Sequence, residues 1–364
     1  MRNPRWFGAS TTSRSIAIGG GKTVVESIRV TISVPTYMRE RFIVGNVRSI
    51  LASTYENFEL IVVDQSPSRS TEYLLSGEFG SEPRLHYIHT DTVGQSRARN
   101  IALGEAQGEL ILYTDDDVLV TEHWIEAYLD CYSHLQVNGI TPGIMGGPIK
   151  GIWETPKPDW WPREFLYCLN EFDLPGGRQK YSGGHFPSAT NFACRTSLLR
   201  AVGGFDERYG YFGSKRRLVT VGGEDTRVVL QLQRMGYDPY FEPRAVVGHI
   251  VVKERLTRRF FYRRLFAAGV DSAALTLAFE EKRPMPPFRL VATNCRQLVR
   301  SLSRLTLGDR LLSERFETQR RMREWGNALK ALGSLFGAWI WSTRLKSQVL
   351  TFRQSNRVVQ RPSD

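Results

Sequence analysis

The chain has 364 residues and a mass of 41.5 kDa, with 41% hydrophobic and 24% charged residues. This composition is that of a folded globular protein and excludes wholesale disorder, a collagen-like fibre and a coiled coil. The four cysteines form no CxxC pair, so neither a disulfide scaffold nor a zinc knuckle is indicated. The length suits one large domain with an appendage, or two domains.

The positive charge is concentrated at the end of the chain. Residues 253–364 carry 23 Lys and Arg against 9 Asp and Glu, a net charge of +14, whereas residues 1–252 carry 26 against 28. A nearly neutral catalytic body with a basic tail fits this distribution better than a uniformly basic nucleic-acid-binding protein. We therefore expect no nucleic-acid partner.

Two segments bear on targeting and membrane insertion. Residues 1–27 are rich in Ser, Thr, Gly and Arg and contain only a brief apolar stretch, which predicts a flexible leader rather than a secretory signal. The most apolar stretch elsewhere, residues 332–341, is far shorter than the roughly 20 residues that a spanning helix needs. We expect no transmembrane helix.

Strand and helix patterns alternate through the first 120 residues. The patterns predict strands over 29–35, 58–64, 84–89 and 109–114, and helices over 39–51 and 95–106. Such alternation is typical of a parallel α/β sheet, whose ligands lie beyond the carboxyl ends of the strands. Three of these strands lead into polar residues: Pro35, Thr36 and Tyr37, then Asp64, then Asp115–Asp117. We expect a site at this edge.

The composition and the predicted secondary structure change twice along the rest of the chain. Residues 142–190 are rich in Gly and Pro, which predicts irregular structure covering one end of the sheet. A helix over 225–235 and a strand pair around Tyr240 and 245–251 are expected next. Beyond Lys253 the chain is predicted to be helical and Arg-rich.

Three consecutive aspartates repel one another unless a cation lies among them. Carboxylate oxygens suit Mg²⁺ and Mn²⁺, which commonly bridge a protein to phosphates. Asp115 and Asp117 are two residues apart, so both can reach one ion while Asp116 points elsewhere. A solvated acidic turn or a helix N-cap is the alternative, but the position at a strand end favours metal binding.

Other acidic and imidazole groups have two interpretations each. Asp64 is either a turn-forming residue or an acceptor for a nucleobase or ribose. Glu224 and Asp225 begin a helix, where they either offset its dipole or supply a general base for a hydroxyl. His249 ends an apolar strand and is either structural or a further metal ligand.

An aromatic cluster and a basic cluster in the second half of the chain also have two interpretations each. Trp160 and Trp161 either stack on an acceptor sugar or lipid, or fill the core beneath a loop. The basic run 215–217 either contacts phosphate groups or is solvated.

Taken together, these segments resemble an inverting family 2 glycosyltransferase with the GT-A fold, over roughly residues 30–272. The resemblance is carried, in chain order, by SVPTYMRE, VVDQS, GQSRARNIAL, LYTDDDV, TNFACRTSLLRAVGGFDE, GGEDTRVVLQLQRMGY and the spaced His249. One departure is Gln65, where the family pattern VDDGS has a second Asp.

The resemblance implies a Rossmann-like α/β sandwich that binds a nucleotide-diphospho-sugar. The implied organisation is a leader at 1–27, a catalytic domain at 28–272 and a basic helical extension at 273–364. Within the catalytic domain, residues 28–120 would form the nucleotide-sugar half and residues 121–272 the acceptor half.

The resemblance also implies a role for each matching residue. The donor would be lined by Pro35, Thr36, Tyr37, Asp64, Arg99, Asp115 and Asp116. Mn²⁺ or Mg²⁺ would be held by Asp115, Asp117 and His249. Asp225 would be the catalytic base and Glu224 would orient it or bind the acceptor. The acceptor side would include Trp160, Trp161 and Asn191.

The implied activity is metal-dependent transfer of a sugar, from a UDP-sugar, to a hydroxyl of a glycan or lipid-linked glycan in polysaccharide or cell-surface glycan synthesis. A single base without a second, nucleophilic carboxylate predicts inversion at the anomeric carbon. The alternatives are a nucleotidyltransferase of similar architecture and a non-catalytic scaffold that binds membrane or sugar.

The basic tail has its own two interpretations. Arginines interleave with leucines and aromatics from Arg289 to Lys346, as in an amphipathic helix that lies on an anionic membrane surface. The alternative is a helix packed on the body. The first predicts a cytoplasmic protein, peripheral on the inner face of the plasma membrane.

Overall fold

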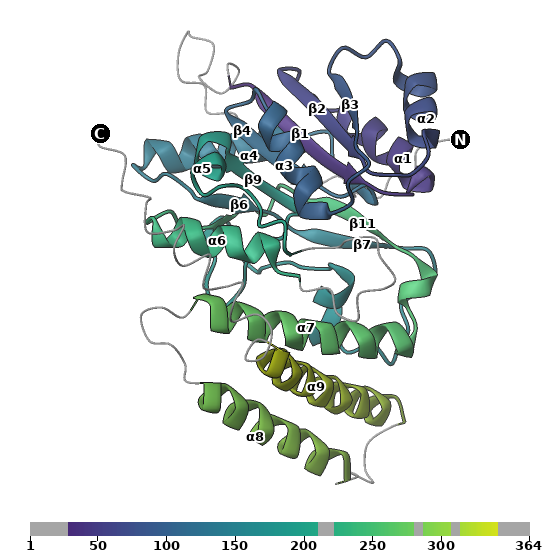
Figure 1. Cartoon of the computed structure of the whole chain (residues 1–364), viewed down its shortest axis with the longest axis vertical. Coiled ribbons are helices and arrows are strands. Elements are labelled where there is room, and N and C mark those ends of the chain that lie inside the picture. The colour runs from purple at the N-terminus through teal and green to yellow at the C-terminus, as the bar shows by residue number, and fades with distance from the viewer. Residues whose placement is uncertain (1–27, 210–221, 280–286, 307–313, 341–364) are drawn as a thin grey trace.

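The computed structural model describes residues 28–209, 222–279, 287–306 and 314–340 (Figure 1). The predicted leader, 1–27, and the basic run 215–217 lie outside the described residues. A body of two sheets with covering helices occupies the upper part of Figure 1, and three long helices lie below it.

The larger sheet has eight strands in the order β3-β2-β1-β4-β9-β6-β10-β8. They are β1 (Val30–Thr36), β2 (Phe58–Asp64), β3 (Leu85–His89), β4 (Leu110–Thr114), β6 (Ile144–Gly146), β8 (Gln179–Lys180), β9 (Asn191–Arg195) and β10 (Tyr240–Phe241). β1 pairs in parallel with β2 and β4, and β9 runs antiparallel to β4 and β6. The four strands predicted in the first 120 residues are confirmed as β1 to β4, to within one residue.

The smaller sheet has the order β5-β11-β7, formed by β5 (Val118–Val120), β11 (Val247–Val251) and β7 (Ile149–Trp153). β11 pairs antiparallel with β5, with His249 opposite Val118. The expectation that the strands around Tyr240 and 245–251 form a pair is wrong. β10 pairs with β6 and β8 in the larger sheet instead.

The body helices are α1 (Glu40–Leu51), α2 (Ser70–Phe79), α3 (Gln95–Glu105), α4 (Trp124–Val137), α5 (Thr196–Ala201) and α6 (Glu224–Arg234). The predicted helices are confirmed as α1, α3 and α6, whereas α2, α4 and α5 were not predicted. The stretch 142–190, expected to be irregular, contains three strands and the 3-10 helix η2 (Arg163–Leu169).

Side chains on the two faces of the larger sheet enter two separate hydrophobic cores. In β4, Leu110 and Leu112 join the core beneath α1 and α4, while Ile111 and Tyr113 join the core beneath α5 and α6. Successive residues of a strand point to opposite faces, so burial of both faces requires this continuous apolar run. The strand ends are thereby held rigidly between helices.

The three helices below the body are α7 (Arg258–Phe279), α8 (Pro287–Thr306) and α9 (Glu314–Ile340), and α9 lies between the other two (Figure 1). Glycines let α7 and α9 touch backbone to backbone. A Cβ on Gly269 would lie 2.0 Å from the Lys330 carbonyl oxygen, and one on Gly333 would lie 2.0 Å from that of Phe266. The boundary expected at 272/273 falls inside α7. Among the described helices, none is both long and apolar enough to cross a membrane.

Candidate active site

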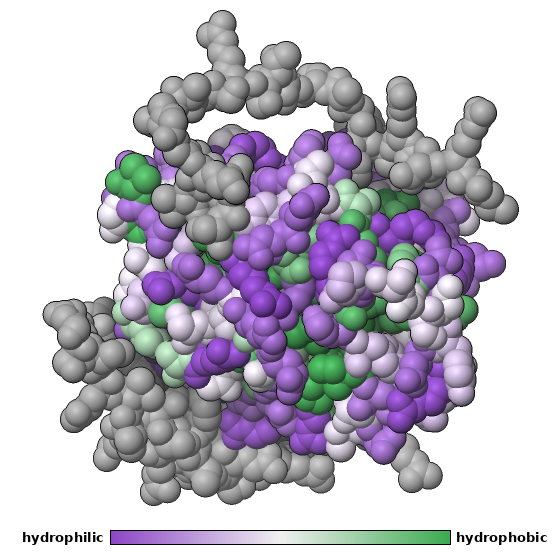
Figure 2. Space-filling view, turned by 90° about the horizontal axis from the view of Figure 1, so that it is seen from above, coloured by the Kyte–Doolittle hydropathy of each residue, from purple (hydrophilic) through white to green (hydrophobic). Residues whose placement is uncertain are grey.

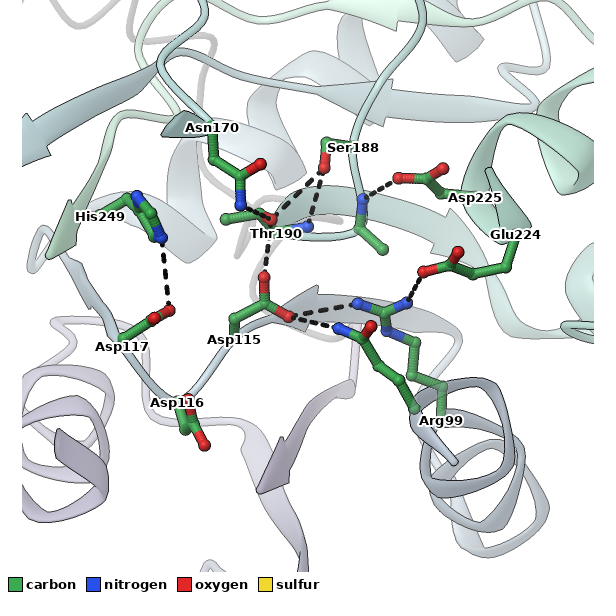
Figure 3. A network of polar contacts seen from close by, with 12 residues as sticks. Arg99, Asp115, Asp116, Asp117, Asn170, Ser188, Thr190, Glu224, Asp225 and His249 are labelled. Carbon is green, nitrogen blue, oxygen red and sulfur yellow. Dashed lines mark hydrogen bonds and ion pairs between the residues drawn. The ribbon is translucent and has the colours of Figure 1, made fainter. Parts of the chain in front are cut away.

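Polar side chains from several elements meet at the carboxyl edge of the larger sheet (Figure 3). Asp115 follows β4, Arg99 lies on α3, Thr190 precedes β9 and Glu224 begins α6. This edge is where the sequence predicted the site.

Arg99 is the residue that joins these elements. Its side chain is only 2% exposed, and Nη1 donates to Glu224 Oε1 at 2.8 Å while Nη2 donates to Asp115 Oδ1 at 3.2 Å. Burial alone would lower the pKa of Arg99, but the carboxylates of Asp115 and Glu224 raise it above its ordinary value. The guanidinium therefore stays charged and holds two acidic motifs together.

Asp115 accepts hydrogen bonds on both oxygens. Besides Arg99, Gln95 Nε2 donates to Oδ1 at 3.3 Å, and Thr190 Oγ1 donates to Oδ2 at 2.7 Å. Burial opposes the charge, but Arg99 and Thr190 hold the pKa of Asp115 below its ordinary value. Asp115 is accordingly an ionised carboxylate fixed between α3 and the loop before β9.

Glu224 and Asp225 begin α6 after Gly223, which has a φ of 87° that favours glycine. Burial and the neighbouring charge of Asp225 raise the pKa of Glu224. Asp225 points toward the loop before β9, where the Ala189 N–H donates to Oδ2 at 3.2 Å, and its Oδ1 accepts from the Thr226 N–H at 2.7 Å (Figure 3). The two carboxylates thus have different partners: Glu224 is paired with Arg99, and Asp225 with backbone N–H groups.

Asp116 points away from Asp115 and is buried beneath the end of β1 (Figure 3). Thr36 Oγ1 donates to its Oδ2 at 2.7 Å. Burial and the adjacent charge of Asp117 raise the pKa of Asp116 to about 7.

Asp117 faces His249, whose Nε2 lies 3.5 Å from Oδ1. This approach follows from the pairing of β5 with β11, which brings His249 beside the residue after Asp117. Burial lowers the pKa of His249, so its imidazole is neutral. Arg39 Nη2 and Arg255 Nη2 each lie 3.4 Å from Asp117 Oδ2, and Arg255 Nη1 donates to His249 Nε2 at 3.0 Å.

The donor set partly fits a divalent cation. A carboxylate and a neutral imidazole, as in Asp117 and His249, suit Mn²⁺. Asp115, the third predicted ligand, instead has its oxygens engaged by Arg99, Gln95 and Thr190. Within the described ranges, no group of three or more His, Cys, Asp or Glu side chains is gathered closely enough to hold a metal ion.

On the predicted nucleotide side, Asp64 forms a turn. Its Oδ1 accepts from the Ser66 N–H at 2.8 Å and its Oδ2 from the Tyr87 hydroxyl at 2.8 Å, and its side chain has no exposed surface. Gln65, the departure from the family pattern, donates to the carbonyl oxygens of Thr92 and Gly94. It therefore fixes the loop that leads into α3. Pro35 is buried within β1, and Tyr37 is partly exposed beyond its end.

Two acceptor-side predictions are corrected by the structure. Trp161 is 1% exposed and packs edge-on against Phe261 of α7, with ring centroids 5.0 Å apart, so it fills the core instead of meeting an acceptor. Asn191 is 1% exposed because it joins the two sheets: its Nδ2 donates to the carbonyl oxygens of Pro148 and Ala245. Trp160 remains partly exposed beside Trp161.

Sequence reasoning missed four residues that contact the acidic groups: Gln95, Thr190, Arg39 and Arg255. The first three lie in or next to segments that carry the family resemblance, so closer reading of those segments could have found them. Arg255 had no such signal. It reaches Asp117 only because the short 3-10 helix η3 (Lys253–Arg255) turns the chain back after β11.

The pairing of Arg99 predicts a large stability difference between two neighbouring arginines. Arg99→Met should lower the free energy of unfolding by about 3–5 kcal/mol, because it leaves Asp115 and Glu224 without their shared cation. Arg97→Met, on the exposed side of the same helix, removes only a surface pair with Glu207 and should cost less than about 1 kcal/mol. Urea denaturation of both variants checks this, and equal losses would contradict it.

Residues 31–203 match the family model described as Glycosyl transferase family 2. The glucosyl-dolichyl phosphate glucuronosyltransferase of Haloferax volcanii is 24% identical over 258 residues, which cover 70% of this chain and 79% of that protein. The putative colanic acid biosynthesis glycosyl transferase WcaA of Escherichia coli is 35% identical over 102 residues, 28% of this chain and 36% of that protein. Other curated glycosyltransferases match over 27–36% of this chain and 14–55% of their own length.

Among solved structures, the mannosyltransferase PcManGT from Pyrobaculum calidifontis, in complex with GDP-Man and Mn²⁺, aligns with 93% of this chain and 83% of its own. The TM-score is 0.47 and the sequence identity is 17%. The matched residues include Asp64, Asp115–Asp117 and strands β2 to β9, whereas Glu224, Asp225 and His249 lie beyond them. Residues 31–203 of this chain therefore form a glycosyltransferase family 2 domain, within an α/β body built on a central sheet and followed by a helical C-terminal region.

Proposed function

We propose that this enzyme transfers a sugar from a nucleotide-diphospho-sugar, a UDP-sugar, to a hydroxyl of a lipid-linked or other glycan in polysaccharide or cell-surface glycan synthesis, with inversion. The observation that carries the proposal is the Arg99 bridge, which draws the acidic segment after β4 and the acidic start of α6 to one edge of the sheet. The similarity to the Haloferax volcanii glucosyl-dolichyl phosphate glucuronosyltransferase supports the lipid-linked acceptor class.

The donor would bind along the ends of β1 and β4. Tyr37 is partly exposed there, and Thr36 and Asp116 form a hydrogen-bonded pair beside it. Asp64 would shape this pocket indirectly, through its hydrogen bonds with Ser66 and the Tyr87 hydroxyl.

Asp225 would be the general base. Backbone N–H groups orient its carboxylate, and Oδ2 retains a further lone pair that can accept the proton of an acceptor hydroxyl. Glu224, held by Arg99, would fix the first turn of α6 and thereby the direction of its neighbour. One base acting without a nucleophilic carboxylate leads to inversion.

Asp117 and His249, with the lone pair that Asp115 Oδ2 retains beside its hydrogen bond from Thr190, would hold Mn²⁺ or Mg²⁺. The ion would stabilise the negative charge that develops on the leaving diphosphate. The guanidinium groups of Arg39 and Arg255 place positive charge of the chain itself at the same carboxylate.

We also propose that α8 and α9 face an anionic membrane, which would make the enzyme peripheral on the inner face of the plasma membrane. α8 carries four arginines and no carboxylate. Three of them, Arg296, Arg300 and Arg304, line a groove of about 350 Å³ that α8 forms with Asn327 of α9. Such a concentration of arginine suits the phosphates of a lipid surface.

Apolar side chains are also exposed on these two helices. Val299 is 65% exposed and Leu302 42% on α8, and Trp325 is 46% exposed on α9. By contrast, the opposite end of the molecule, seen from above in Figure 2, is mostly hydrophilic, with apolar residues in small separate groups. Exposed Val, Leu and Trp beside arginines form the composition of an interfacial helix.

Asp225→Asn should lower turnover by about 10²–10⁴-fold, because the amide cannot take up the acceptor proton, while donor binding is retained. Release of nucleoside diphosphate measures turnover, and Asp173→Asn, on the exposed surface, is the control. A non-catalytic scaffold would lose little binding in either variant. Release of pyrophosphate by the unaltered protein would instead identify a nucleotidyltransferase.

Thermal shift with UDP-, GDP-, CMP- and dTDP-sugars, each with and without Mn²⁺, tests the donor and metal sites. We expect one nucleotide class to stabilise the protein, by about 2.7 kcal/mol at a hundredfold excess over its Kd, and Mn²⁺ to increase the effect. Asp117→Asn should abolish the Mn²⁺ increment, whereas Asp91→Asn, on a fully exposed side chain, should keep it. An unchanged increment in Asp117→Asn would argue against this ligand.

Sedimentation with vesicles tests the membrane proposal. The full chain should bind to phosphatidylcholine vesicles that contain phosphatidylglycerol. It should bind much more weakly to vesicles of phosphatidylcholine alone. Replacing both Arg296 and Arg300 with Gln should weaken binding on the order of thirtyfold, at about 1 kcal/mol for each arginine. Arg97→Gln, on the body, is the control. Equal binding by both variants would contradict the proposal.

A further inference from the structure

Helix α7 reaches the start of α6 through one carboxylate. Asp271 Oδ1 accepts a hydrogen bond from the Gly222 N–H at 2.7 Å. Gly222 stands three residues before Asp225, outside the first turn of α6. The Asp271 side chain is 14% exposed, and its Oδ2 lies 3.6 Å from Arg264 Nη1, two turns earlier on α7. This contact links α7 directly to the backbone just before the proposed base.

The backbone before α6 needs such a restraint, because glycine has more conformational freedom than any other residue and two glycines, Gly222 and Gly223, stand here in succession. Both glycines pack closely on α7. A Cβ on Gly222 would lie 3.1 Å from Asp271 Oδ2, and one on Gly223 would lie 3.0 Å from Leu275 Cδ1. Asp271 and Leu275 are four residues apart and share one face of α7. A polar and an apolar contact from that face therefore fix the two glycines.

The position of α7 is itself fixed by α9. Besides the close approach of Gly269 and Gly333, Ser334 Oγ donates to the Gly269 carbonyl oxygen at 2.9 Å, two residues before Asp271. Glycines at a contact between two helices allow the backbones to approach more closely than larger side chains would. Gly222 is therefore supported by a helix, α7, whose own position is fixed by α9.

We propose that Asp271 is a positioning residue for Asp225: it holds the Gly222 backbone so that the first turn of α6 presents the base to the acceptor. Asp271 contacts neither the metal pair nor the donor-side residues described above. It acts through the glycine pair, and the C-terminal helices are in this way part of the scaffold of the active site. The inference rests on the proposed role of Asp225 as the base.

The contact itself is tested without an activity assay. In the full chain, Asp271→Ala should accelerate hydrogen exchange in peptides that cover Gly222 and the first turn of α6, while peptides from β1 to β4 stay protected. Asp271→Asn keeps an acceptor oxygen and should retain the protection. Ser272→Ala, on the exposed neighbour, is the matched control. Unchanged exchange in Asp271→Ala would overturn the proposal.

Kinetics test the consequence for catalysis. Asp271→Ala should lower kcat by about 10–100-fold through misplacement of the base, with the donor Kd unchanged, and Asp271→Asn should recover most of kcat. A parallel loss of kcat, donor binding and Tm would indicate a merely structural role and overturn the proposal. If the alanine variant does not fold, Asp271→Glu, which keeps the charge but displaces the carboxylate, should show the same loss; full kcat there would equally overturn it.

Failure of this proposal can be told apart from failure of the proposed function. If the unaltered protein turns over no nucleotide-sugar, the function fails while the exchange experiment still decides whether Asp271 restrains Gly222. If turnover depends on Asp225 but not on Asp271, only the positioning role fails.

Discussion

A single buried guanidinium holds the candidate active site together. Arg99 binds one carboxylate 16 residues away along the chain and another 125 residues away. Two buried carboxylates at one edge of a sheet would repel each other strongly, and burial makes each more costly still. The acidic segment after β4 and the acidic start of α6 can therefore occupy the same edge only because α3 supplies a cation between them.

The three aspartates after β4 are divided among different partners. Asp115 turns toward Arg99 and Thr190, Asp116 toward Thr36, and Asp117 toward His249 (Figure 3). The smaller sheet is responsible for the last of these, because β11 carries His249 alongside β5. Three consecutive aspartates thus occupy three different chemical environments. Arg99 balances the charge of Asp115, and Arg39 and Arg255 balance that of Asp117.

Much of this could be predicted from sequence, for identifiable reasons. β1, β2 and β4 are apolar runs that are buried on both faces, so their pattern is strong, and the residues that follow these parallel strands had to lie at one edge of the sheet. The burial of Trp161 and Asn191 could not be predicted, because a tryptophan or an asparagine suits a core as well as a surface and only the packing of α7 and the second sheet decides. The Arg255 contact required the turn of η3, which no periodicity encodes.

The glycine contacts between α7 and α9 have a consequence for the order in which the enzyme matures during synthesis. The strands and the acidic segments leave the ribosome early, but α7 gains its brace only when residues near Gly333 have emerged. Until then Phe261 and Leu265 of α7 lack part of their apolar cover, and the backbone at Gly222 lacks a rigid support. A nascent chain can therefore hold a nearly complete sheet long before its proposed base is set in place.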